Sequence, residues 1–178
     1  MENSCAFTGH RPKKFPWGYD ETDSRCVKLK AALTAQIQKL VDAGVTDFYS
    51  GMAEGTDTWA ALIVLDLCKK NPALKLHCVL PCKGQDGKWA PSARKLYKGI
   101  LRKADTVTYV STDYHDGCML ERNRYLVEHA AYLLAVYNGA WRGGTAATVR
   151  YARKMGRGII VIEPTSLRVT HEHLCEKA

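Results

Sequence analysis

Two glycines and a threonine near the C-terminal third of the chain form the strongest candidate for an anion site. Gly143 and Gly144 precede Thr145 in the segment NGAWRGGT, and helical periodicity begins directly after them. Such glycines leave backbone N–H groups accessible, and the positive end of the helix dipole faces the same side. Thr145 can cap the helix or contact a phosphate. The segment is therefore expected to bind an anionic ligand.

A second glycine-rich segment, SGMAEGTD, contains Gly51, Gly55 and Thr56 around Glu54. Its glycines and hydroxyl group also suit a phosphate at the start of a helix. A carboxylate beside a phosphate would repel it, so Glu54 is expected to hydrogen-bond ribose hydroxyls or to carry a proton. Asp57 is interpreted as an acid of the first helical turn. The alternative is a plain turn between a strand and a helix.

Two further groups of residues complete the candidate site. In the segment TGHRP, Gly9 permits a tight turn and a close approach of the backbone to a ligand. Arg11 can hold a phosphate or carboxylate with two parallel hydrogen bonds, and His10 can exchange a proton near neutral pH. Arg122 and Asn123 fall in the first turns of a later helix, whose start is expected to face the same crevice.

The elements that must position these residues alternate between strand and helix along the chain. Expected strands cover residues 4–8, 47–50, 74–80, 106–110, 132–137 and 158–162, and expected helices lie between them. This order predicts an α/β fold: a single Rossmann-like, doubly wound, mainly parallel sheet with helices on both faces. One domain is expected over 1–178, with a core at about 4–163 and a polar tail over 164–178. Ligands of such sheets bind at the carboxyl ends of the strands.

The composition agrees with this fold and excludes several classes of protein. The 178 residues are 46% hydrophobic and 25% charged, which is unlike disordered, collagen-like or disulfide-stapled chains. The longest apolar run, 59–65, is far shorter than the roughly 20 residues of a membrane-spanning helix. Seven scattered cysteines without a secretion signal indicate reduced thiols and a cytoplasmic location. A net charge of +8 favours anionic partners.

Other chemistry-bearing residues are given structural interpretations. His171, Glu172, His173 and Cys175 lie in the polar tail, so no metal site is expected. Arg94, Lys98 and Arg102 repeat every four residues and are interpreted as a solvated helix face, although a nucleic-acid surface is a less favoured alternative. Three tryptophans are either buried or contacts of a homo-oligomer: Trp17, Trp89 and Trp141.

The motifs TGHRP, SGMAEGTD, ERN and NGAWRGGT, in this order, resemble the YpsA-type branch of the SLOG superfamily. The resemblance covers the chain from about Cys5 to Ile162. This superfamily is Rossmann-like, includes the DprA/Smf proteins and the LOG phosphoribohydrolases, and is thought to bind nucleotides or nucleotide-derived ligands. The resemblance implies that one pocket gathers Gly9, His10, Arg11, Gly51, Glu54, Gly55, Arg122, Asn123, Gly143, Gly144 and Thr145.

One departure affects the expected activity. LOG enzymes carry a glutamate after their glycine motif that assists cleavage of the N-glycosidic bond, and Thr148 stands at that position here. The expected function is therefore binding of a nucleoside phosphate, ADP-ribose or an NAD-like compound by a sensor or regulatory protein that requires no cofactor. The alternatives are an N-glycosidic hydrolase that uses Glu54 and a DprA-like single-stranded nucleic-acid binder.

Overall fold

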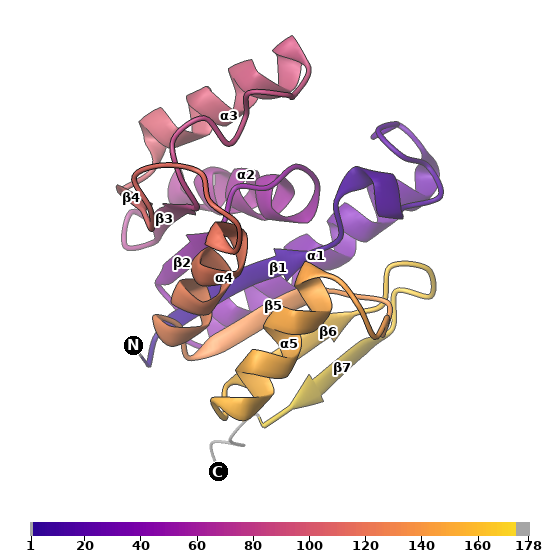
Figure 1. The fold of residues 1–178 in the computed structure, drawn as a ribbon. Coiled ribbons are helices and arrows are strands. Elements are labelled where there is room, and N and C mark those ends of the chain that lie inside the picture. The colour runs from indigo at the N-terminus through magenta and orange to yellow at the C-terminus, as the bar shows by residue number, and fades with distance from the viewer. Residues whose placement is uncertain (1, 174–178) are drawn as a thin grey trace.

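All six predicted strands are present in the computed structural model, which describes residues 2–173 (Figure 1). They are β1 (Ser4–Gly9), β2 (Asp47–Ser50), β3 (Lys75–Leu80), β4 (Thr106–Tyr109), β5 (Tyr132–Val136) and β6 (Gly158–Ile162). A seventh strand, β7 (Val169–Glu172), joins them in one sheet of order β4-β3-β2-β1-β5-β6-β7. The first six strands are parallel, and β7 is antiparallel to β6. The predicted Rossmann-like, mainly parallel sheet is confirmed.

Helices cover both faces of this sheet, as predicted (Figure 1). One side carries α1 (Ser24–Asp42) and α2 (Thr56–Cys68), and α3 (Pro91–Lys103) packs against α2. The other side carries α4 (Cys118–Glu128) and α5 (Gly144–Lys154), which contact each other. A short 3-10 turn, η1 (Pro12–Lys14), follows β1.

The sheet divides the hydrophobic core into two layers. Along β1, Phe7 points toward α1 and α2 and stacks on Phe48 of β2, with ring centroids 5.8 Å apart. Its neighbour Ala6 belongs to the layer beneath α4 and α5. Because side chains alternate across a strand, each buried strand supplies both layers. The carboxyl ends of the strands are thereby held in fixed positions.

A seventh strand, which the sequence did not predict, lies within the segment expected as a polar tail over 164–178. Residues 169–172 pair with β6 through the backbone, and Arg153 forms an ion pair with Glu172 at 2.7 Å. An edge strand with both faces partly exposed does not need the apolar alternation that reveals a buried strand. His171 and Glu172 thus belong to the sheet, whereas Cys175 lies outside the described residues.

Three smaller expectations have definite outcomes. Thr56, expected at the start of a helix, is the first residue of α2, and Gly55 occupies the cap position. The six cysteines among the described residues are free thiols. Within 2–173, none of the helices combines the length and hydropathy needed to cross a bilayer.

The three tryptophans differ in exposure, which bears on the two predicted alternatives, burial and contact in a homo-oligomer. Trp17 is buried against Phe15, Trp89 is half-buried, and Trp141 is 80% exposed. Only Trp141 therefore retains the large exposed surface expected of an interface anchor. A homo-oligomer stays a prediction.

The strand order reverses at β1. The chain adds β2, β3 and β4 on one side of β1 and then crosses to add β5 on its other side. The connections that leave the carboxyl ends of β1 and β5 consequently diverge, which opens a crevice between them.

Candidate functional site

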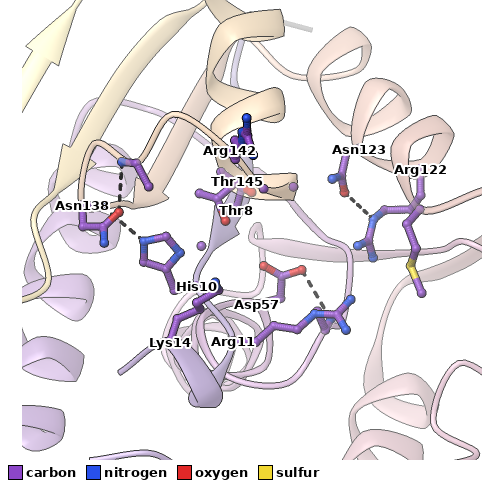
Figure 2. A pocket seen from close by; sticks show the side chains of 16 residues that line it. Thr8, His10, Arg11, Lys14, Asp57, Arg122, Asn123, Asn138, Arg142 and Thr145 are labelled. Atoms are coloured by element: carbon purple, nitrogen blue, oxygen red, sulfur yellow. Dashed lines mark hydrogen bonds between the residues drawn. The ribbon is translucent and has the colours of Figure 1, made fainter. Parts of the chain in front are cut away.

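A pocket of about 310 Å³ lies in this crevice at the carboxyl ends of the strands (Figure 2). Residues from four parts of the chain converge on it: the connections after β1 and β5, the start of α2, and the first turns of α4. The pocket is lined by Thr8, Gly9, His10, Arg11, Lys14, Ala53, Asp57, Met119, Arg122, Asn123, Asn138, Ala140, Arg142, Gly143, Gly144 and Thr145.

Most of the residues predicted from the sequence meet in this pocket, although they are far apart along the chain. Those that line it are Gly9, His10, Arg11, Arg122, Asn123, Gly143, Gly144 and Thr145. Four others do not line it, namely Gly51, Glu54, Gly55 and Thr56. Their predicted contacts with a ligand stay predictions.

Three of those four residues lie directly behind the lining. A Cβ atom on Gly51 would approach Arg122 Nη1 to 2.3 Å, and one on Gly55 would approach the His10 carbonyl oxygen to 2.9 Å. The Thr56 hydroxyl donates a hydrogen bond to that same carbonyl at 3.1 Å. These small residues let the lining side chains and the β1 loop sit close to the backbone.

The guanidinium group of Arg122 is the most enclosed charge in the pocket, since the residue is only 3% exposed. Its Nη1 donates to the Gly51 carbonyl, and its Nε donates to Asn123 Oδ1 at 2.8 Å (Figure 2). Burial lowers the pKa of Arg122, and the carboxyl group of Asp57 acts in the opposite direction. Both bonds fix the plane of the guanidinium group, and its Nη2 has no hydrogen-bond acceptor within residues 2–173.

Five polar or charged lining residues were not among the predicted site residues, namely Thr8, Lys14, Asp57, Asn138 and Arg142, and Asp57 is the one acid among them. It was expected to be a helix-start acid, and it does lie in the first turn of α2, but it is 6% exposed and lines the pocket. Its Oδ2 accepts a bond from the Ala53 N–H at 3.3 Å. Burial raises the pKa of Asp57, whereas Arg122 and Arg11 lower it.

On the opposite wall, His10 holds the connection after β5. Its Nε2 accepts a hydrogen bond from the Asn138 N–H at 3.3 Å, and the Asn138 side chain accepts one from the Ala140 N–H at 3.1 Å. Burial lowers the pKa of His10, which favours the neutral imidazole that this acceptor role requires. The two diverging loops are thus joined at the mouth of the pocket (Figure 2).

The start of α5 supplies backbone donors to the same pocket. Gly143 is the cap residue, with φ of 109°, and no side chain caps the helix. The first helical bond joins the Ala147 N–H to the Gly143 carbonyl, so the earlier N–H groups precede the helical ladder. Thr145 lines the pocket but does not cap the helix. This arrangement favours a bound anion.

The side chains around the pocket also favour a negatively charged ligand, because most of the charged ones are cationic. Four cationic side chains line it, belonging to Arg11, Lys14, Arg122 and Arg142, against one carboxyl group, that of Asp57. Glu54 is half-buried outside the lining; burial raises its pKa, while Arg11 and Lys13 act in the opposite direction. The pocket therefore attracts anions.

Two further observations concern the chemistry of the site. Thr148, which stands where LOG enzymes have a glutamate, is buried, and its hydroxyl donates to the Gly144 carbonyl at 2.8 Å. Across the described part of the chain, no three histidine, cysteine or acidic side chains gather in a way that could hold a metal ion.

Comparisons with known proteins agree with this fold and these motifs. A UPF0398 protein of Bacillus pumilus is 29% identical over 150 residues, which cover 83% of this chain and 80% of that protein. The uncharacterized SPbeta prophage-derived protein YoqJ of Bacillus subtilis is 32% identical over 141 residues, covering 72% and 82% respectively.

Among solved structures, DNA processing protein A from Helicobacter pylori, whose single-stranded DNA binding mode was determined, superposes with a TM-score of 0.60. The match covers 90% of this chain and 65% of that one at 17% sequence identity, which supports a common fold alone. The sequence model of the YspA SLOG family matches residues 5–165. The resemblance carried by the four motifs is confirmed, and the chain belongs to the YspA SLOG family.

Proposed function

We propose that the pocket binds a phosphate-bearing nucleotide or nucleotide derivative, such as a nucleoside phosphate, ADP-ribose or an NAD-like compound. The observation that carries this proposal is the buried guanidinium group of Arg122, which lines the pocket. A buried charge costs stability unless it is paired, and here one acid is shared among four lining cations. A ligand phosphate is the counter-charge that such a site accommodates best.

The backbone at the start of α5 supports the same ligand chemistry from the opposite side. A phosphate between Arg122 and Gly144 would receive charge-assisted bonds from one and N–H donors from the other. A carboxylate deep in the same pocket is suited to a neutral, hydroxyl-rich group. Asp57 is therefore better placed than Glu54 to accept hydrogen bonds from ribose hydroxyls.

Binding can be tested by calorimetry with AMP, ADP-ribose, NAD, ribose 5-phosphate and a single-stranded DNA oligomer. The variant Gly144→Asp adds a carboxylate to the anion site, and Gly144→Ala is its matched control. A Cβ at this position would lie 3.8 Å from Asn123 Nδ2, an ordinary contact. Binding of a nucleotide is expected to be lost in Gly144→Asp and kept in Gly144→Ala. Equal affinity of wild type and Gly144→Asp would refute the assignment.

Hydrolysis of an N-glycosidic bond is a second candidate, favoured by one observation. Asp57 is the carboxyl group that lines the pocket, and burial raises its pKa, as a general acid at neutral pH requires. Incubation with nucleoside monophosphates should then release free base, and Asp57→Asn should abolish the release while Glu54→Gln keeps it. An absence of free base from wild type that binds the nucleotide would restrict the protein to binding.

A further inference from the structure

A second concave surface lies between α2 and α3, away from the ligand pocket. It has a volume of about 520 Å³, and leucines from both helices line it, among them Leu62 and Leu96. Leu62 is 37% exposed and Leu96 is 42% exposed, while Ile100 closes the base. Figure 1 shows α3 at the periphery, beside α2. We call this surface the α2–α3 groove.

The rim of the groove is strongly basic. Helix α3 contains no acidic residue, so its own sequence offers no compensating charge. Its five cationic residues are Arg94, Lys95, Lys98, Arg102 and Lys103. Like charges four residues apart destabilise a helix, and three of these cations follow one another at that spacing. Arg94 pairs with Asp86 at 3.2 Å, whereas Lys95, Arg102 and Lys103 line the groove.

Gly99 adds a second feature that intramolecular packing does not explain. Glycine within a helix costs up to about 1 kcal/mol relative to alanine. A Cβ atom at Gly99 would meet no heavy atom within 4 Å, so no neighbour in the described chain requires a glycine there. Gly99 lines the groove, and because it has no side chain, the surface of α3 is recessed between Leu96 and Ile100. Such a gap lets another helix approach α3 closely.

We propose that the α2–α3 groove docks an acidic amphipathic helix of a partner protein. The leucines of the groove would receive the apolar stripe of that helix, and the rim cations would receive its carboxylates. Charge complementarity selects this occupant. A second copy of the chain would bring the same cations against each other, and a nucleic acid would leave the exposed leucines without an apolar partner.

The test uses a labelled synthetic peptide of roughly 16 residues, long enough to hold a helix, with leucines on one face and glutamates elsewhere. Fluorescence anisotropy compares it with a scrambled peptide of the same composition and with a lysine-for-glutamate peptide. Only the amphipathic acidic peptide is expected to bind. Equal binding of the scrambled peptide would overturn the proposal, as would no binding of the acidic one.

Gly99→Glu is the variant that tests the location. It places a carboxylate in open space and improves helix propensity, so the protein should remain folded by circular dichroism. Peptide affinity is expected to fall by about tenfold or more through repulsion and obstruction. Lys28→Gln, an exposed substitution on α1 that lowers the net charge by one as Gly99→Glu does, is the matched control and should retain affinity. Equal affinity of Gly99→Glu and wild type would refute the groove as the site.

Two other outcomes would assign the surface to another occupant and overturn the proposal. One is binding of an oligothymidylate that competes with the peptide and is lost in Gly99→Glu. The other is a dimer of the wild type, seen by sedimentation, that dissociates in Gly99→Glu. The pocket variant Gly144→Asp should bind the peptide normally, so the result does not depend on the proposed nucleotide site.

Discussion

Gly51 does not itself line the pocket, but replacing it by alanine should disable the anion site by displacing Arg122. The added methyl carbon would lie 2.3 Å from Arg122 Nη1 and 2.5 Å from its Cζ, far inside any real contact. Arg122 is almost fully enclosed, so its guanidinium group must leave its position and lose the bond to the Gly51 carbonyl. The displaced group also loses the hydrogen bond that it would donate to a ligand phosphate. A hydrogen bond to a charged group contributes about 1.5–3 kcal/mol, which corresponds to a loss of roughly 10- to 150-fold in affinity for the ligand.

The assay is calorimetric titration with whichever nucleotide of the panel binds wild type most tightly. Gly144→Ala is the control, because its methyl group fits within ordinary contact distance. The double variant Gly51→Ala/Arg122→Ala should bind no more weakly than Arg122→Ala alone, since both changes remove the same interaction. Unchanged affinity in Gly51→Ala, or additive losses in the double variant, would refute the role given to Arg122.

Three further predictions concern stability. Gly9→Ala should lower the free energy of unfolding in urea by about 1–3 kcal/mol, because its Cβ would lie 2.4 Å from Thr56 Oγ1 and 2.5 Å from Thr56 Cβ. Adding Thr56→Gly, which removes both of these atoms, should recover part of that loss. Burial raises the folded-state pKa of Asp57. The free energy of unfolding should therefore fall as pH rises from the ordinary aspartate pKa through the raised value. In urea titrations at several pH values, Asp57→Asn should remove that dependence. Burial lowers the folded-state pKa of His10, so the free energy of unfolding should fall as pH drops from the ordinary histidine pKa to the lowered one. Protonation of the imidazole should also break the hydrogen bond that it accepts from the Asn138 N–H. An NMR titration that gives the imidazole an ordinary or raised pKa would contradict this prediction.

Much of the site could be predicted because glycine carries a local signal. Gly143 and Gly144 precede a helix after a buried strand, and parallel strands place all such loops at one edge of the sheet. The same signal cannot tell what the glycine makes room for. Gly51 and Gly55 are expected to contact a ligand, and that stays a prediction, but the structure also shows that they make room for Arg122 and the backbone of His10.

Asp57 and β7 were missed for different physical reasons. An acid in the first turn of any helix is stabilised by the helix dipole, so its type and position do not reveal whether it faces solvent or a pocket. That depends on how α2 is rotated against the sheet, which long-range packing decides. Strand β7 pairs through backbone groups at an edge, where side chains need no alternation, and its four residues therefore resemble a loop in sequence.

The wide distribution of the lining residues has a consequence for detecting ligands. Thr8 and Thr145 both line the pocket, so the chain must fold from β1 through the start of α5 before the pocket exists. Any compound that binds only this assembled state shifts the equilibrium of the entire sheet, not of one loop. A thermal-shift screen of metabolite mixtures should thus report occupancy as a rise in the melting temperature of the whole molecule.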